Sequence, residues 1–326
     1  ELNYLQGGAQ HFHTINGGNT VFNSFRVTER GKVSKVISTS DVKKEFLNKF
    51  IAKPNSKLGL NFDTPIVMGV LNVTPDSFYD GERSFSEKQF VEKGLKLLKL
   101  GCCILDVGGE STRPGAKEVA HSIEIERVIG VIKKIKKSVP SAIISVDTRK
   151  AIVAEKALQA GASIVNDISA GSFDEKMFGV VAKYKAGMCL MHSQGLPENM
   201  QNKPHYENVL LDIYDYLKEK IAEAESTGIS RKRIIIDPGI GFGKSFSHNM
   251  EIIKKASLFL GLGCPLMIGV SRKSFIGEII SERLPSARLS GSIAAMLKIG
   301  SNGVNIVRVH DVKETVDAMK VWNILK

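Results

Sequence analysis

Side chains that can bind charged or polar groups follow several short apolar stretches of this sequence. One set combines an amide with cations and an imidazole: Asn72, Arg113, Arg308 and His310. Cationic donors beside an amide oxygen can hold a phosphate or pyrophosphate together with a metal ion. These residue types predict a phosphorylated ligand if the fold brings them together.

A second set is acidic and accompanies one lysine. Asp147, Asn166 and Asp237 each end an apolar stretch, and Lys273 follows another in "GVSRKSF". Carboxylate and amide oxygens suit a flat heterocycle rich in N–H donors, and a lysine suits its carbonyl oxygen or ring nitrogen. Each Asp alone has a simpler explanation, because an Asp at a strand end often caps the next helix. The complete set predicts a ligand-binding site.

The elements that position these residues follow one repeated pattern. A short apolar run leads into a polar loop with Gly or Pro, and then into a segment of helical periodicity such as "SEKQFVEKGLKLLKLG". The apolar runs do not alternate with polar residues, which is typical of strands covered on both faces. Eight such units in about 260 residues predict an α/β fold, the (β/α)₈ TIM barrel. A doubly wound sheet is the alternative, but its GxGxxG loop is missing. The runs begin near Ile66, Cys102, Ala142, Ser163, Gly187, Arg233, Pro265 and Val304.

A barrel would bring the two sets together, because catalytic residues lie at the C-terminal ends of its strands. The phosphate-binding set follows strands eight, one and two, which become neighbours when the barrel closes. The acidic set follows strands three, four and six and faces the barrel mouth beside Lys273. The strand ends are therefore the predicted active site.

Residues 1–63 lie outside the repeat and are predicted to form an N-terminal extension to a barrel of residues 64–326. "GGNTVFNSFRV" and "KVSKVIST" predict a hairpin. "SDVKKEFLNKFI" predicts a short helix capped by Ser40 or Asp41, and "KPNSKLGL" a linker.

The composition predicts a cytoplasmic protein without a nucleic-acid or membrane partner. No apolar run approaches the roughly 20 residues that span a bilayer, and the four cysteines form no CxxC pair. The net charge is +11, but residues 1–60 hold nine basic and four acidic residues, nearly half of the excess. The other lysines spread along helical faces, as on a solvated surface.

The sequence resembles the dihydropteroate synthases, a family of folate synthesis, through seven motifs in the same order and spacing: "MGVLNVTPDSF", "DVGGESTRPGA", "SVDT", "IVNDIS", "DPGIGFGK", "GVSRKSFIG" and "RVHDVKET". The resemblance covers about residues 64–326. It implies a barrel transferase that joins 6-hydroxymethyl-7,8-dihydropterin pyrophosphate to p-aminobenzoate and releases pyrophosphate. It also implies Mg²⁺ as the cofactor and these small molecules as partners.

The resemblance divides the site residues among three subsites. The pterin-binding positions are Asp147, Asn166, Met191, Asp237 and Lys273. The pyrophosphate-binding positions are Asn72, Thr112, Arg113, Arg308 and His310, and Asn72 is also the implied metal ligand. The p-aminobenzoate positions are Phe78, Thr112, Pro114, Phe242, Lys273 and Ser274. A helix that starts at Ser274 would also suit the aminobenzoate carboxylate.

The implied reaction is a displacement at the activated CH₂ group of the pterin. Pyrophosphate leaves before the weakly nucleophilic arylamine attacks, because the electron-rich pterin stabilises positive charge. Arg308 and His310, with Mg²⁺, take up charge on the leaving group, while Asp147 and Asp237 stabilise the cationic pterin. These four residues and Lys273 are the implied catalytic groups, and sulfonamides, as mimics of p-aminobenzoate, are implied competitors.

Two other classes of function remain as alternatives. Pterin-binding methyltransferase domains, which use methyltetrahydrofolate, would keep the acidic set but have no need of "STRPG" and "RVHDV". A basic binding protein without catalysis would bind nucleic acid in a salt-sensitive way. The extension could be the junction to an upstream pyrophosphokinase. An exposed apolar face on "SGSIAAMLKIGSNG" would favour a homodimer, but the same pattern is equally typical of a core helix.

Overall fold

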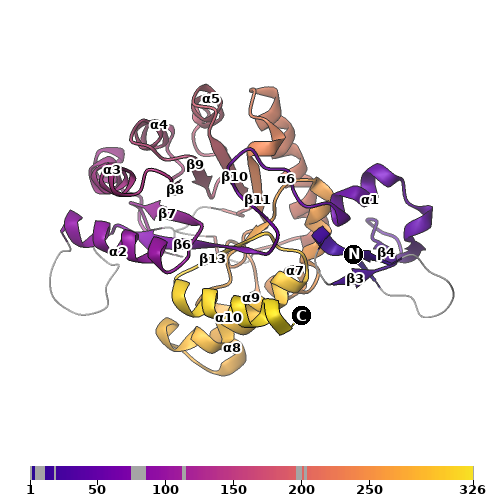
Figure 1. Ribbon diagram of the computed structural model, residues 1–326. Helices are drawn as coiled ribbons and strands as arrows, with labels where there is room; N and C mark the ends of the chain where they lie inside the picture. Colours follow the sequence, from indigo (N-terminus) through magenta and orange to yellow (C-terminus); the bar gives the residue numbers. More distant parts are fainter. Residues whose placement is uncertain are drawn as a thin grey trace.

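The computed structural model describes residues 2–3, 12–17, 20–74, 86–111, 115–195, 200–201 and 204–325. Its centre is an eight-stranded parallel sheet whose strands stand in chain order, with β13 next to β6 (Figure 1). The two ends of this strand order are β11 and β12. A parallel bridge between Ile236 and Leu266 joins them, and the Ile236 N–H donates to the Pro265 carbonyl at 3.0 Å. The sheet is therefore a closed (β/α)₈ barrel, as the sequence predicts. Its strands are β6 (Ile66–Asn72), β7 (Ile104–Gly108), β8 (Ile143–Asp147), β9 (Ile164–Asp167), β10 (Gly187–Met191), β11 (Ile234–Asp237), β12 (Met267–Ile268) and β13 (Ile306–Val309).

Helices surround the barrel and cover its outer face (Figure 1). They are α2 (Glu87–Lys99), α3 (His121–Ser138), α4 (Ala151–Gln159), α5 (Met177–Lys183), α6 (Val209–Ser226), α7 (Phe246–Lys254), α8 (Ser274–Ile280), α9 (Leu289–Ser301) and α10 (Val312–Leu325). Short 3₁₀ turns lie between some of them: η4 (Arg231–Arg233), η5 (Ala256–Leu262) and η6 (Pro285–Arg288). Among the described residues, no helix combines the length and apolar character needed to cross a membrane.

The helix α2 shows how local sequence sets these elements. Ser86 and Gln89 form a capping box at its start, where the Ser86 N–H donates to Gln89 Oε1 at 2.9 Å. Its buried face carries Phe90, Gly94 and Leu97. A Cβ at Gly94 would lie 2.5 Å from Ile135 Cδ1 of α3, so only glycine permits this close packing of helices on the sheet.

The lower half of the barrel interior, toward the N-terminal ends of the strands, is apolar. Inward side chains from the strands form one buried cluster: Ile66, Met68, Ile104, Ile164, Cys189, Ile235, Met267 and Ile306. Phe62 belongs to the same cluster, and Leu58 and Leu60 pack against it. The segment predicted as a linker therefore closes the bottom of the barrel with apolar side chains.

The N-terminal extension contains the predicted hairpin and helix. Strands β4 (Ser24–Val27) and β5 (Lys35–Ser38) pair antiparallel, and α1 (Lys44–Ile51) follows. The smaller elements are β1 (Leu2–Asn3), β2 (His13–Thr14), η1 (Ile15–Gly17), β3 (Val21–Phe22) and η2 (Thr39–Asp41). The predicted cap of α1 is wrong, because Ser40 and Asp41 lie in η2, which Ser38 caps, and Lys43 precedes α1. Extended backbone at Val42 separates the two helices.

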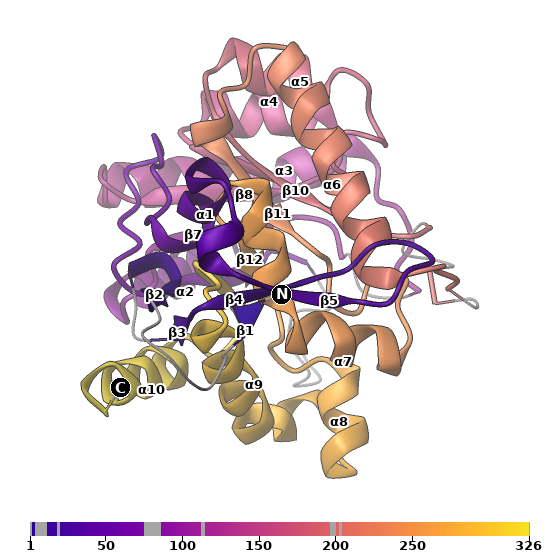
Figure 2. The same cartoon turned by 90° about the vertical axis from the view of Figure 1, so that its right-hand side faces the viewer.

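The extension also contacts the side of the barrel, through α1 and through the loop between β4 and β5. Lys49 of α1 donates to the Gly261 carbonyl of η5 at 3.2 Å. The loop between β4 and β5 reaches α6 (Figure 2), where Arg30 binds Asp212 at 2.5 Å and Asp215 at 2.9 Å. The extension thus packs along the side of the barrel as well as beneath it.

Candidate active site

The predicted site residues that end strands form the upper layer of the barrel interior, above the apolar cluster. Successive side chains of a strand alternate between its faces, so residues two or four positions after an inward apolar residue also point inward. Met68 is followed in this way by Asn72, Ile164 by Asn166, and Ile235 by Asp237. The strand register places Asn72, Gly108, Asp147 and Asn166 in one row across four neighbouring strands. The apolar layer below Asp147 and Asp237 keeps water away from that side of the two buried carboxyl groups.

Arg308 links the two sets of residues that the sequence separated. Its Nε donates to Asp106 Oδ2 at 2.7 Å, and its Nη2 donates to Asp147 Oδ2 at 2.6 Å. Burial raises the pKa of Asp147 to about 7, although Arg308 opposes this shift; nearby Asp106 adds to it. The paired carboxylates raise the pKa of Arg308 against the effect of its own burial, so the guanidinium stays charged. Arg308 therefore lies with the acidic set, and its predicted place in a pyrophosphate subsite stays a prediction.

Asp106 belongs to the same cluster of side chains, although the sequence did not lead us to predict it. It lies inside the apolar run of β7 and is fully buried. Besides Arg308, Asp106 Oδ2 accepts a hydrogen bond from Asn166 Nδ2 at 3.1 Å. The signal was present, because Asp106 stands two residues after the inward-facing Ile104.

Asp237 and Lys273 lie on the other side of the mouth. Asp237 is buried, burial raises its pKa, and its Oδ1 accepts the Gly239 N–H at 2.7 Å. Lys273 directly precedes α8, and its Nζ lies 4.3 Å from the centroid of the Phe242 ring. Burial lowers the pKa of Lys273 to about 8; Arg308 adds to this shift and Asp237 opposes it.

A glycine-rich loop after β11 carries Phe242 into the site. Gly239 has a φ of +70°, and a Cβ there would lie 2.0 Å from the His192 carbonyl oxygen, so the turn requires glycine. Phe242 forms a small buried cluster with Met191, Ile168 and Met200. The predicted pterin residue Met191 and the predicted aminobenzoate residue Phe242 therefore share one apolar wall.

A buried lysine holds this loop in place. Lys244 Nζ donates to the Phe242 carbonyl at 2.9 Å and to the His192 carbonyl at 3.3 Å, and it lies 3.0 Å from His192 Nδ1. Burial lowers the pKa of Lys244 to about 7 and that of His192 to about 2. The sequence reasoning gave this pair no role, because its partners come from two separate loops.

His310 lies at the end of β13 beside Ser271. Ser271 Oγ accepts the His310 backbone N–H at 3.2 Å and lies 3.1 Å from His310 Nδ1. Burial, with Arg308 nearby, lowers the pKa of His310 to about 3, so the imidazole is neutral near pH 7.

Of the other predicted residues, the structure describes Asn72 and Ser274 but not the remaining four. Asn72 is half-buried at the end of β6, and Ser274 is exposed at the first position of α8, where the sequence placed a helix start. A Cβ at Gly108 would lie 3.7 Å from Asn72 Oδ1, so Asn72 belongs to the same rim as Asp147. Phe78, Thr112, Arg113 and Pro114 lie outside the described residues.

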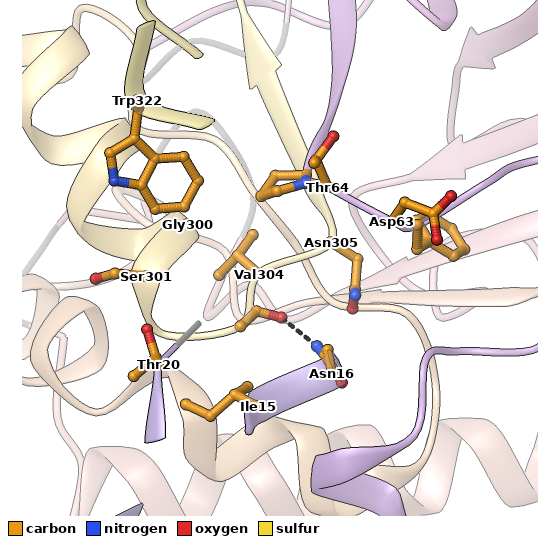
Figure 3. A pocket seen from close by; sticks show the side chains of 13 residues that line it. Ile15, Asn16, Thr20, Asp63, Thr64, Gly300, Ser301, Val304, Asn305 and Trp322 are labelled. Atoms are coloured by element: carbon orange, nitrogen blue, oxygen red, sulfur yellow. Dashed lines mark hydrogen bonds between the residues drawn. The ribbon is translucent and has the colours of Figure 1, made fainter. Parts of the chain in front are cut away.

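A cavity of about 280 Å³ lies at the opposite end of the barrel (Figure 3). It is bounded by η1, by the residues just before β6 and β13, and by Trp322 of α10. Asn16 donates to the Gly303 carbonyl at 2.8 Å beside it. None of the predicted site residues that the structure describes lines this cavity. Since barrels place their chemistry at the C-terminal strand ends, the cavity is not the active site.

Comparison with known proteins agrees with this geometry. Residues 68–310 match the model of a family described as pterin binding enzyme. Dihydropteroate synthase of Escherichia coli K12 is 44% identical over 262 residues, which is 80% of this chain and 92% of that protein. The chain belongs to the dihydropteroate synthase family. As a dihydropteroate synthase it is a transferase of folate biosynthesis, and the resemblance seen in its motifs is confirmed.

Solved dihydropteroate synthases share the barrel. The Xanthomonas albilineans enzyme with 4-aminobenzoic acid has a TM-score of 0.77 at 41% identity and covers 82% of this chain and 94% of its own. The Yersinia pestis enzyme in complex with a sulfonamide drug has a TM-score of 0.78 at 35% identity and covers 92% and 99%. The TIM-barrel prediction is therefore confirmed by topology and by likeness to solved dihydropteroate synthases.

Proposed function

We propose that the upper layers of the barrel bind 6-hydroxymethyl-7,8-dihydropterin pyrophosphate and condense it with p-aminobenzoate to give 7,8-dihydropteroate and pyrophosphate. One observation carries the assignment of residues: Arg308 is held by Asp106 and Asp147 at the mouth that also contains Asp237 and Lys273. A buried set of acceptors around one lysine suits the N–H-rich edge of a pterin.

Unsatisfied acceptors support a ligand at this place. Asp106 Oδ1 and Asp147 Oδ1 are buried and have no hydrogen-bond partner within the described part of the chain. Buried polar atoms normally have partners, so these two oxygens favour a ligand that brings N–H groups. Asn166 and Asp237 add further acceptors, and Lys273 would donate to the pterin carbonyl oxygen or ring nitrogen.

The same groups suit the charge that develops in the reaction. When the C–O bond to pyrophosphate breaks, its electron pair leaves with pyrophosphate and the pterin becomes cationic. Asp147 and Asp237 have raised pKa values in the free site, and a cationic ligand beside them would favour their charged forms. Preorganised carboxylates would then stabilise the cation until the amine of p-aminobenzoate forms the new C–N bond.

The leaving group would meet neutral donors at the rim of β13 and β6. His310 is neutral, so it would donate one N–H and add no charge, and Asn72 offers an amide. Mg²⁺ often takes one or two protein oxygens and completes its shell with phosphate oxygens and waters, and the half-buried Asn72 fits that donor set. When bound there, Mg²⁺ would neutralise charge on the pyrophosphate.

p-Aminobenzoate would lie against Phe242 and Lys273, with its carboxylate toward Ser274 at the start of α8. The 4-aminobenzoic acid and the sulfonamide drug bound by the two related enzymes have the chemistry expected for this subsite. Sulfonamides should therefore compete with p-aminobenzoate for this chain. Purely uncompetitive inhibition with respect to p-aminobenzoate would contradict the placement.

The test is release of pyrophosphate from the pterin pyrophosphate, measured with and without p-aminobenzoate. The wild-type chain should release pyrophosphate and form dihydropteroate in equal amounts. Asp237→Ala and Arg308→Ala should each lower kcat/KM by about a hundredfold or more, because each removes a charged group from a buried site. Unchanged kinetics in both variants would overturn the assignment of the site.

A further inference from the structure

Asp106 occupies a central position in the barrel. Its strand β7 has β13 two strands away on one side and β9 two strands away on the other. Arg308 reaches Asp106 from β13, and Asn166 reaches it from β9, both on the same oxygen, Oδ2. One buried carboxylate therefore connects two residues of the proposed pterin site from opposite directions.

We propose that Asp106 is a positioning residue for pterin recognition, an inference that rests on the proposed function. An ionised carboxylate only accepts hydrogen bonds, so the Asn166 side chain must turn its NH₂ group toward Asp106. The Asn166 carbonyl oxygen is then turned away from Asp106 and is presented as an acceptor. Without Asp106 the amide could rotate by half a turn and present a donor to the N–H donors of the pterin.

Asp106 also fixes the plane of the Arg308 guanidinium. It accepts from Nε at 2.7 Å while Asp147 accepts from Nη2 at 2.6 Å, so the two carboxylates hold two different nitrogens of a planar group. Asp147 alone would leave that group free to turn about one contact. The arrangement predicts that loss of Asp106 disturbs the pterin subsite more than the aminobenzoate subsite, which Phe242 and Ser274 form elsewhere.

The first test is Asp106→Asn, with the KM of each substrate and binding of the pterin pyrophosphate alone measured by calorimetry. The KM and Kd for the pterin should rise about tenfold or more, because a neutral amide weakens the charge-assisted hydrogen bonds from Arg308 and Asn166 and can also turn a donor toward them. The KM for p-aminobenzoate should change little. An unchanged pterin KM and Kd in a folded variant would overturn the inference.

The second test is a double-mutant cycle with Asn166→Ala, because removal of the Asn166 amide leaves Asp106 no amide to orient. Asp106→Asn should then raise the pterin Kd less in the Asn166→Ala background than in the wild-type chain, with only the contribution through Arg308 remaining. An equal rise in both backgrounds would contradict the proposed orientation of Asn166.

Asp167→Asn is the matched control. Asp167 is as fully buried as Asp106, but its carboxylate accepts from the Ser169 and Gly171 N–H groups of its own loop. This variant should lower the melting temperature without raising the pterin KM, and an equal effect on pterin KM would overturn a specific role for Asp106. A wild-type chain that releases no pyrophosphate would instead refute the proposed function, which keeps the two failures distinct.

Discussion

Lys273 and Phe242 face each other at the mouth of the barrel, with the lysine Nζ 4.3 Å from the centroid of the aromatic ring. The two side chains come from different loops, one directly before α8 and one in the glycine-rich turn after β11. A cation over an aromatic face is attracted by the ring, which is one way to hold a lysine where burial disfavours its charge. The contact places Lys273 between the proposed pterin and aminobenzoate subsites.

Lys273→Ala should therefore weaken binding of both substrates and lower kcat/KM by about a hundredfold, because it removes a half-buried cation that would donate hydrogen bonds to the substrates. Lys273→Arg should restore only part of the activity, since the larger planar guanidinium can stack on the ring but does not present its donors in the directions of a compact ammonium. Steady-state kinetics of pyrophosphate release would measure both. Lys313→Ala, on the exposed face of α10, is the control, and wild-type kinetics in Lys273→Ala would remove Lys273 from the site.

The raised pKa of Asp147, about 7 against a usual 3.8, predicts how stability depends on pH. Between these values the folded state holds a proton on Asp147 that the unfolded state has released. Stability therefore falls as the pH rises from about 4 to 7, because the folded state binds more protons there. Asp147→Asn should flatten this part of the pH profile, measured as the melting temperature of wild type minus that of the variant. If this difference in melting temperature stays constant between about pH 4 and pH 7, the pKa of Asp147 is not raised in the folded state.

Ser271 is expected to select the tautomer of His310. Its Oγ already accepts the His310 backbone N–H, so its own proton can be donated to Nδ1, which leaves the His310 proton on Nε2. Ser271→Ala should lower kcat about tenfold with a small change in the KM for p-aminobenzoate. Ser271→Thr keeps the hydroxyl and should retain most of the activity. Equal loss in the Ala and Thr variants would indicate a packing effect instead.

Lys244 should act on p-aminobenzoate through Phe242, whose carbonyl it binds at 2.9 Å. Lys244→Met keeps the length of the side chain but removes its donors to Phe242 and His192. We expect a rise of about tenfold in the KM for p-aminobenzoate and a smaller change in the KM for the pterin. Lys255→Met, a partly exposed lysine of the same region, is the control. A larger effect on the pterin than on p-aminobenzoate would contradict this role.

The strand ends could be predicted because each apolar run stops at a polar side chain, and a barrel gathers such ends at one face. Asn72, Asp147, Asn166 and Asp237 were predicted in this way, and the structure places each of them at the last or next-to-last position of its strand. Asp106 was missed because it lies inside an apolar run, although the two-residue period from Ile104 marks it as inward. The contacts of Arg308 could not be predicted, since its long side chain spans two strands to reach Asp106.

The conformations of the loops could not be predicted from sequence patterns either. Lys244 and His192 follow different strands, and their contact depends on how two loops fold over each other. The start of α1 was misplaced for a similar reason, because Ser38 caps a separate 3₁₀ turn that the helical pattern does not reveal. In both cases the structure depends on contacts between particular loop residues. Such contacts follow neither the helical nor the strand periodicity, so sequence patterns do not reveal them.

The packing of the N-terminal segment predicts unequal effects of two substitutions. Phe62 is buried beneath the barrel against the apolar interior cluster, so Phe62→Ala should cost about 3–5 kcal/mol of unfolding free energy through the cavity it leaves. Arg30 binds Asp212 and Asp215 at the surface, and exposed ion pairs contribute little, so Arg30→Ala should leave the melting temperature nearly unchanged. Chemical denaturation of both variants measures the contrast. A small loss for Phe62→Ala would mean that the apolar residues below the barrel can be removed without harm to its core, contrary to their packing in the structure.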